Sequence, residues 1–280
     1  MRLSLMTYTV HGGQPGGLGT LEEIADFARE VGFAALELSA RDLTANTPAQ
    51  AREICATRGL AISCINGPAD LAAAADADFE AGLAQGRELI AAAAEMDCPV
   101  VMIIPGRATG PEDKPRAAAR IAEGLRELAA LGAEAGVAVS IEDFPNPLAP
   151  YASVEEVGYL LRAAPGLGLT FDNGNWLIGG DDPVAAVAAF GDRIVNCHVK
   201  DWEPDPDQGR IRLPDGTWIR GGLHGAGLLD HRAILSALVA SGYDGALAFE
   251  YEGPLDHLDA TRTGIAYLRG VLDDLGVDVR

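Results

Sequence analysis

Four side chains that bind divalent cations well come at the ends of four consecutive apolar stretches. Glu142, Asp172, His198 and Glu250 each lie inside or directly after a stretch rich in apolar and β-branched residues. Neighbouring side chains of a strand point to opposite faces, so Glu142 and Ile141 face different sides. A carboxylate or an imidazole on the inner face of a buried sheet is costly unless something compensates it. One shared cation would compensate all four.

Each of these residues also has an ordinary structural explanation. Glu142 could begin a loop, and Asp172 could cap the turn that its Asp-Asn-Gly sequence favours. His198 could be a hydrogen-bonded core histidine, and Glu250 could pair with Lys200. The recurrence of the same strand-end position in four successive stretches favours a common metal site.

Three carboxylates and one imidazole form a hard set of ligands. Such a set suits Mn²⁺, Mg²⁺ or Co²⁺ better than a thiolate-bound structural zinc, although Zn²⁺ is also compatible. We expect one divalent metal ion, with Mn²⁺ as the first choice. Its open positions would take substrate oxygens, as a Lewis-acid site requires.

The elements that must position these residues alternate along the chain. Short apolar stretches predict strands, and longer Ala-, Leu- and Glu-rich stretches between them predict helices. Caps support helices over 21–31, 116–135 and 154–163: Thr20 with Glu23 forms a capping box, Gly136 ends the second helix, and Ser153 precedes the third. The predicted strands are residues 3–9, 34–38, 61–65, 100–104, 137–141, 168–171, 194–199 and 246–250.

Alternating strands and helices predict parallel pairing through crossover helices. This number of units in 280 residues predicts a single (β/α)₈ TIM barrel over residues 1–280, in which the carboxyl ends of the strands meet on one face. A doubly wound open sheet is the alternative. The Gly-rich segment 11–17 after the first strand lacks the GxGxxG spacing and contains Pro15, so we expect a flexible loop over the barrel mouth instead.

The long segment between residues 201 and 228 predicts an insertion after the seventh strand. Residues 210–213 and 217–220 alternate apolar and polar side chains around Pro214, Asp215 and Gly216. Alternation on both sides of an Asp-Gly turn is typical of a β-hairpin. We expect it on the face of the barrel that carries the chemistry.

The composition excludes several classes of partner. Hydrophobic residues make up 48% of the chain, and the formal net charge is -20 at pH 7. Such a charge disfavours nucleic acid and anionic membranes. We find no membrane span and no signal peptide. The absence of a CxxC pair indicates reduced, buried thiols in a cytoplasmic protein. The cysteines are Cys55, Cys64, Cys98 and Cys197.

The Glu-Asp-His-Glu pattern on the fifth to eighth strands, with His-Val-Lys-Asp at 198–201 and Phe-Glu-Tyr-Glu at 249–252, resembles the xylose-isomerase-like barrel superfamily. That superfamily includes sugar phosphate isomerases and epimerases, ketose 3-epimerases, inosose isomerases and dehydratases, and endonuclease IV. The resemblance covers nearly the whole chain. Its motifs are specific to the superfamily but say little about the substrate.

The resemblance implies that Glu142, Asp172, His198 and Glu250 bind the metal. It also implies that Glu142 and Glu250 act as the acid/base pair, moving a proton next to a carbonyl through an enediolate. The expected activity is a metal-dependent isomerase or epimerase acting on a ketose, an aldose or a cyclitol. Relatives often form homo-oligomers through the helices of the barrel, which we also expect here.

The chain departs from relatives at several strand ends. Asn175 stands where many relatives carry a histidine in an Asp-x-x-His motif that binds substrate or a further zinc ion, and we count Asn175 among the substrate contacts. Ile65-Asn66 and Ile104-Pro105 lack the histidines of the three-zinc nuclease. These departures favour one metal ion and disfavour DNA repair.

Further candidate substrate contacts flank the predicted site. Lys200 shares the inward face of His198 and could polarise a substrate oxygen or pair with Glu37, itself a candidate contact. His224, in the loop after the seventh strand, could return to the barrel mouth. Arg107 could meet a phosphate or a carboxylate, or be a solvated charge.

Other polar and aromatic residues have weaker predicted roles. Trp176 and Trp202 follow the sixth and seventh strands and could shield the site or stack on a sugar ring. Glu252 points the same way as Glu250 and could support it. His231 and His257 lie at helix starts, where we expect surface residues.

Three rival functions remain open. A lyase or dehydratase could use the same metal and base to eliminate a leaving group from a keto-sugar or inosose, with His224 or Lys200 as the acid. A non-catalytic sugar-binding barrel would retain the metal without turnover. A single-metal phosphodiester hydrolase is opposed by the acidic charge and the missing histidines.

Overall fold

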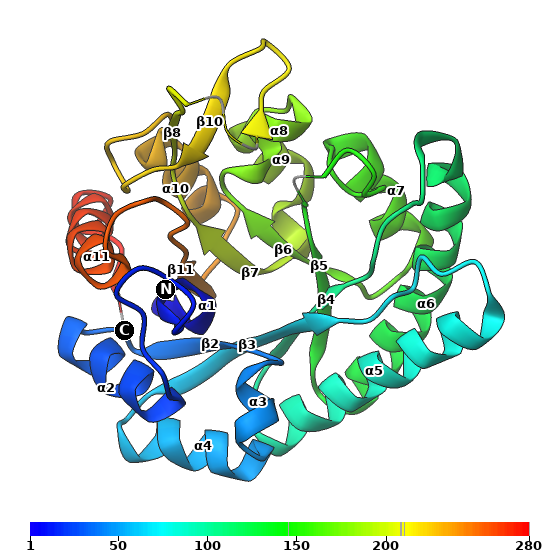
Figure 1. The fold of residues 1–280 in the computed structure, drawn as a ribbon, viewed down its shortest axis with the longest axis horizontal. Helices are drawn as coiled ribbons and strands as arrows, with labels where there is room; N and C mark the ends of the chain where they lie inside the picture. The colour runs from blue at the N-terminus through cyan, green and yellow to red at the C-terminus, as the bar shows by residue number, and fades with distance from the viewer. Residues whose placement is uncertain (145, 208, 210, 280) are drawn as a thin grey trace.

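The computed structural model describes residues 1–144, 146–207, 209 and 211–279. Within them, eight parallel strands close into a barrel in the order β1-β11-β7-β6-β5-β4-β3-β2, a TIM barrel with its helices on the outside (Figure 1). The barrel strands are β1 (Arg2–Met6), β2 (Ala35–Ser39), β3 (Ala61–Pro68), β4 (Val100–Ile104), β5 (Ala138–Glu142), β6 (Gly168–Asp172), β7 (Ile194–Val199) and β11 (Ala246–Phe249).

The helices follow the strands in chain order. They are α1 (Thr7–Val10), α2 (Leu21–Val31), α3 (Asp42–Ala45), α4 (Pro48–Thr57), α5 (Asp76–Glu95), α6 (Lys114–Glu134), α7 (Val154–Ala163), α8 (Asn175–Gly179), α9 (Pro183–Phe190), α10 (His231–Ala240) and α11 (His257–Asp274). Short 3₁₀ turns, η1 (Pro111–Asp113) and η2 (Gly191–Arg193), precede α6 and β7. None of the described helices is both long and apolar enough to cross a lipid bilayer.

The predicted caps form as expected. Thr20 and Glu23 make both bonds of the capping box at the start of α2, and Ser153 accepts a bond from Glu156 N–H at the start of α7. Gly136 follows α6 with a φ of 72°, which favours glycine. Local sequence therefore determines where these helices begin and end.

The first predicted strand is too long. It was expected over residues 3–9, but β1 ends at Met6 and residues 7–10 form α1. Thr7, although β-branched, donates its hydroxyl to the buried Asp42 carboxylate at 2.6 Å. Asp42 is the first residue of α3, so this bond joins α1 to the helix that follows β2.

The Gly-rich segment 11–17 is a loop without the phosphate-binding spacing. A bridge between His11 and Leu18 closes it, and its Pro15 carbonyl accepts the N–H of His257 at 2.9 Å. These bonds fasten the loop to the start of α11.

The predicted hairpin forms and gains a third strand. β9 (Ile211–Arg212) and β10 (Trp218–Gly221) pair antiparallel, and β8 (Trp202–Pro204) pairs with the other edge of β10. Gly216 has a φ of 94° in the turn, which favours glycine. Arg210, the first residue of the predicted hairpin, lies outside the described residues. Figure 1 shows this small sheet beside β7 and α8.

The barrel interior is filled directly below the strand ends. Ser140 and Thr170 face the same side as Glu142 and Asp172, because side chains two apart share a face. Their hydroxyls lie 2.8 Å apart in a buried hydrogen bond. A separate small apolar cluster fills the adjacent interior: Cys64, Val100 and Met102.

All four cysteines are buried and free, as the sequence predicted.

Candidate metal centre

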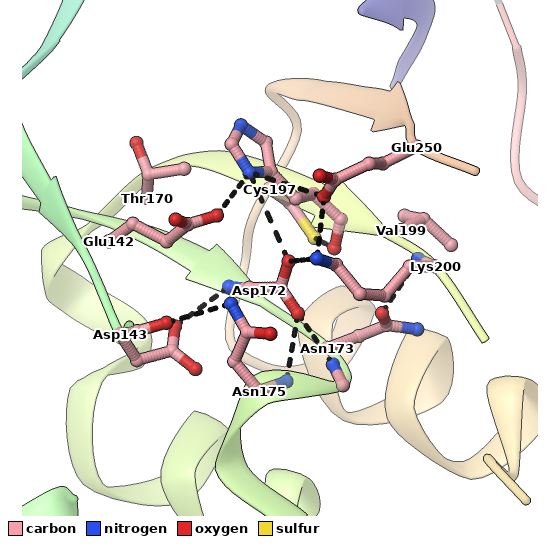
Figure 2. A network of polar contacts seen from close by, with 12 residues as sticks. Glu142, Asp143, Thr170, Asp172, Asn173, Asn175, Cys197, Val199, Lys200 and Glu250 are labelled. Carbon is pink, nitrogen blue, oxygen red and sulfur yellow. Dashed lines mark hydrogen bonds and ion pairs between the residues drawn. The ribbon is translucent and has the colours of Figure 1, made fainter. Parts of the chain in front are cut away.

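The four predicted ligands converge at the carboxyl ends of neighbouring strands. Glu142 and Asp172 end β5 and β6, His198 lies in β7, and Glu250 directly follows β11. One potential ligand atom from each lies within 4.8 Å of the others. The parallel register explains this convergence, because Asp172 and Ala248 both pair with His198. Figure 2 shows the carboxylates pointing toward one another.

His198 presents its Nδ1 atom to three carboxylates. This nitrogen lies 2.6 Å from Glu142 Oε1, 4.0 Å from Asp172 Oδ2 and 3.9 Å from Glu250 Oε2. A single cation placed among these oxygens would therefore meet an imidazole nitrogen as well.

Glu37 supports His198 from behind. Its Oε1 atom lies 2.9 Å from His198 Nε2, and its side chain is fully buried. Asn66 and Asn196 donate amide hydrogens to the two oxygens of Glu37 at 3.1 and 2.8 Å. A carboxylate that holds the second nitrogen of a metal-binding histidine is a common arrangement.

This geometry corrects the prediction that Glu37 contacts substrate or pairs with Lys200. Glu37 lies beneath the imidazole with no exposed surface. The sequence missed Asn66 and Asn196 as its partners. Asn196 precedes His198 by two residues, so strand alternation would have placed it on the same inward face.

Lys200 pairs with the carboxylates of the cluster. Its Nζ atom lies 2.9 Å from Glu250 Oε2, 3.2 Å from Asp172 Oδ2 and 3.1 Å from Glu252 Oε2. The residue is 5% exposed. The pairing of Lys200 with Glu250, which the sequence offered as the structural alternative to a metal role for Glu250, is therefore present, and Lys200 shares the inward orientation of His198.

The two carboxylate oxygens of Asp172 make different contacts. Oδ1 accepts the N–H groups of Gly174 and Asn175 at 2.8 and 2.9 Å, which caps the turn after β6. Oδ2 points into the cluster toward Lys200. The N–H of Asp172 donates to Asp143 Oδ1 at 2.9 Å. The turn cap and the metal-ligand position therefore coexist in one residue.

Burial and neighbouring charges shift the ionisation of the cluster. Burial raises the pKa of Asp172 to about 7; Lys200 opposes the shift, and Glu142 adds to it. Burial also raises the pKa of Asp143 well above its ordinary value, with Asp172 adding to the effect. For His198, burial lowers the pKa, but Glu37 and Glu142 outweigh it and the net shift is upward.

The residues fit one divalent cation. Asp172 Oδ2 and Glu250 Oε2 are buried, and both face the Lys200 ammonium, at 3.2 and 2.9 Å. One ammonium does not balance several buried carboxylates, and uncompensated buried charge is costly. A hard cation would satisfy both, together with Glu142 and the imidazole.

Comparison with known proteins agrees with this architecture. Residues 25–271 match the family described as xylose isomerase-like TIM barrel. The chain belongs to this family. Inosose dehydratase from Lacticaseibacillus casei is 30% identical over 89 residues, which is 30% of this chain and 30% of that protein. The sequence match thus spans a minor part of this curated relative.

Two solved structures share the fold of this xylose isomerase-like barrel over nearly its full length. L-ribulose 3-epimerase has a TM-score of 0.77 and 19% identity, covering 98% of this chain and 95% of that chain. The IOLI protein, with a bound zinc atom, has a TM-score of 0.78 and 17% identity, covering 98% of this chain and 99% of that chain. At these identities the likeness concerns the fold alone.

Two predicted substrate contacts, His224 and Trp176, lie between the strands of this xylose isomerase-like barrel and its outer helices. His224 is buried, stacks on Phe249 with ring centroids 4.1 Å apart, and lies 2.8 Å from the Val199 carbonyl. Burial lowers its pKa to about 3. Trp176 is fully buried against Phe171. These positions contradict the predicted contacts of His224 and Trp176, because both rings are packed behind the strands.

Asn175 begins α8, three residues after Asp172, and its predicted contact with substrate stays a prediction. It is 2% exposed, and its amide donates to the Asp143 carbonyl at 2.9 Å. It therefore fastens the loops after β5 and β6. Trp202, also predicted to lie near substrate, is buried with its ring 5.3 Å from Lys200 Nζ.

His231 and His257 are buried, so their predicted surface positions are wrong. His231 Nε2 lies 3.0 Å from the Lys200 carbonyl, and His257 Nδ1 lies 2.6 Å from the Thr9 carbonyl. Both rings hold segments that follow barrel strands. Arg107 is exposed in the loop after β4, near the carboxyl ends of the strands.

Proposed function

We propose that this protein is a metal-dependent isomerase or epimerase that enolises a ketose, an aldose or a cyclitol. The observation that carries the proposal is the placement of Glu142 and Glu250 on either side of Asp172 and His198. They come from β5 and the end of β11, with β6 and β7 between them. Two carboxylates that flank one cation site suit proton removal and return.

Each glutamate retains an oxygen for proton transfer. Glu142 places Oε1 against His198, and Glu250 places Oε2 against Lys200. Within the described part of the chain, no hydrogen bond engages the other oxygen of either residue. One glutamate would remove the proton next to the substrate carbonyl, and the other would return it.

A bound divalent cation, Mn²⁺ in our proposal, would stabilise the negative charge that develops on substrate oxygens during enolisation. Lys200 would donate a hydrogen bond to a substrate oxygen at the same end of the site. Glu252, 3.1 Å from the Lys200 ammonium, would hold that donor in place. Asp172 and His198, both buried, would keep their positions throughout.

Elimination on the same scaffold is the second candidate. The match to an inosose dehydratase favours it, because loss of water from a keto-cyclitol begins with the same proton removal. Glu142 or Glu250 would act as the base, and Lys200 would face the departing hydroxyl. The two reactions therefore share their first step.

The test is solvent deuterium exchange. The Mn²⁺-loaded protein is incubated in D₂O with ketoses, aldoses and inososes, and the products are analysed by mass spectrometry and NMR. We expect one deuterium at the carbon next to the carbonyl, with no exchange in Glu142→Gln or Glu250→Gln. An isomer keeps its heavy-atom composition, whereas a dehydration product has lost water. Absence of exchange with every substrate would reject both reactions.

A further inference from the structure

A cavity of about 600 Å³ lies at the carboxyl ends of β3 and β4. Pro68 and Ile104, the last residues of these strands, pair with each other and line it. Ile103 pairs with Ile141 of β5, which brings Ile104 level with Glu142. The cavity therefore opens on the same face and at the same height as the proposed ligands.

The loop after β4 holds Arg107 at this cavity. The Gly106 carbonyl, before Arg107, accepts the Tyr151 hydroxyl at 2.6 Å. The Ala108 N–H, after Arg107, donates to the Leu148 carbonyl at 3.0 Å. Both chain neighbours of Arg107 are thus fixed to the loop after β5.

Gly106 is required for this close packing. Its φ is +82°, and a Cβ atom there would lie 2.2 Å from Asp70 Oδ1. Only glycine lets the loop approach Asp70 so closely in this conformation. The loop after β4 therefore packs closely against the segment that follows β3.

Arg107 forms no ion pair with any residue that the structure describes. In the described ranges, no hydrogen bond or ion pair engages its guanidinium, although the chain has 41 acidic and only 21 basic residues. Arg116, nearby in the sequence, is paired with Asp113 at 2.6 Å. Asp70 also lines the cavity, but its Oδ1 accepts the Ala72 N–H and it forms no ion pair with Arg107.

We propose that Arg107 binds an anionic group of the substrate, a carboxylate or a phosphate, in this cavity. The inference rests on the proposed function and narrows it from neutral sugars to sugar acids or sugar phosphates. The carbonyl end of the substrate would lie among the four ligands, and the anionic end beside Arg107. A guanidinium presents a planar set of donors that matches both oxyanions.

The test compares matched substrates that differ in one anionic group. The pairs are D-fructose with D-fructose 6-phosphate and D-glucose with D-glucuronate, assayed by deuterium exchange with the Mn²⁺-loaded protein. We expect a lower KM for an anionic member. Arg107→Gln should raise that KM about 10- to 100-fold, the contribution of a hydrogen bond to a charged group, with kcat nearly unchanged. If the KM of D-fructose 6-phosphate rises in Arg107→Gln, the anionic group is a phosphate; if that of D-glucuronate rises, it is a carboxylate.

The matched control is Arg126→Gln. Arg126 is an exposed arginine in α6 that likewise has no hydrogen bond or ion pair to the described residues, and its loss should leave every KM unchanged. Asp70→Asn, which removes a negative charge from the cavity, should lower the KM of the anionic member. An equal effect of Arg107→Gln on neutral and anionic members, or no effect on either, would overturn the inference.

A binding measurement separates this inference from the proposed function. If no substrate exchanges deuterium, calorimetric titration with D-fructose 6-phosphate and D-glucuronate still tests Arg107. Binding weakened at least about tenfold by Arg107→Gln and unchanged by Arg126→Gln supports the anion site. Equal binding by wild type and Arg107→Gln rejects it.

Discussion

Both ring nitrogens of His198 contact carboxylates. Nδ1 faces the three carboxylates that we propose as metal ligands, while Nε2 lies 2.9 Å from the fully buried Glu37. The two asparagine amides that donate to Glu37 leave its carboxylate little freedom to move. A fully buried carboxylate therefore supports the orientation of the imidazole.

Glu37→Gln should weaken Mn²⁺ binding about 10- to 100-fold, because it removes the charge that orients His198 and makes it a better ligand. Isothermal titration calorimetry of purified protein measures this change. Glu95→Gln, an exposed substitution at the end of α5, is the control and should bind Mn²⁺ as wild type does. Unchanged affinity in Glu37→Gln would show that His198 is held without it.

At the scale of elements, the end of β7 is held by histidines from the segment that follows the small sheet. His224 and His231 lie within hydrogen-bond distance of the carbonyls of Val199 and Lys200, two consecutive residues. His224 also stacks on Phe249 of β11. These rings therefore tie the insertion and α10 to the two strand ends that carry Lys200 and Glu250.

His224→Gln should lose less stability than wild type when the solution is acidified. Burial lowers the pKa of His224 to about 3, whereas the unfolded chain binds a proton near the ordinary value. The unfolded state therefore holds more protons between these values, and stability falls as pH falls through this window. At pH 5 this linkage costs wild type about 2 kcal/mol relative to neutral pH.

Urea unfolding of both proteins at pH 7.5 and pH 5 measures the difference. The partly exposed His11→Gln is the control and should follow wild type. Parallel loss of stability in wild type and His224→Gln would contradict the buried, neutral state of His224.

For the molecule as a whole, strand order and strand ends could be predicted from local patterns. The predicted strands over 100–104 and 194–199 coincide with β4 and β7. The convergence of Glu142, Asp172, His198 and Glu250 could also be predicted, because side chains alternate between the two faces in every barrel strand. The burial of His224, His231 and His257 could not be predicted in this way, because their carbonyl acceptors come from segments distant in sequence or from the ends of other strands.

The environment of Arg107 also could not be predicted from local sequence. Its sequence context allowed either a solvated charge or an anion contact. The loop that carries Arg107 is held by Asp70, Leu148 and Tyr151. Tertiary packing brings these residues to the end of β4. Local sequence therefore supplies the ligands, and tertiary structure supplies the supports and the cavity.

Proton linkage predicts how the whole protein responds to pH. The pKa of Asp172 is about 7, raised first by burial, and that of His198 is raised because Glu37 and Glu142 outweigh burial. Folding without metal therefore takes up protons, and the stability from these two groups declines as pH rises through their pKa values. Metal binding requires both groups to lose their protons.

Mn²⁺ affinity should therefore rise between about pH 6 and pH 8, with protons released on binding. Calorimetry in two buffers of different ionisation enthalpy measures both quantities. An affinity that is constant over this range, without proton release, would contradict protonated Asp172 and His198 in the metal-free protein.

The central claim is that four side chains from neighbouring strands hold one divalent cation. Anomalous diffraction from a crystal grown with saturating Mn²⁺ tests it most directly. We predict one strong peak per chain, coordinated by Glu142, Asp172, His198 and Glu250. A barrel mouth without a peak, or a peak bound by other residues while these four point apart, would contradict the account.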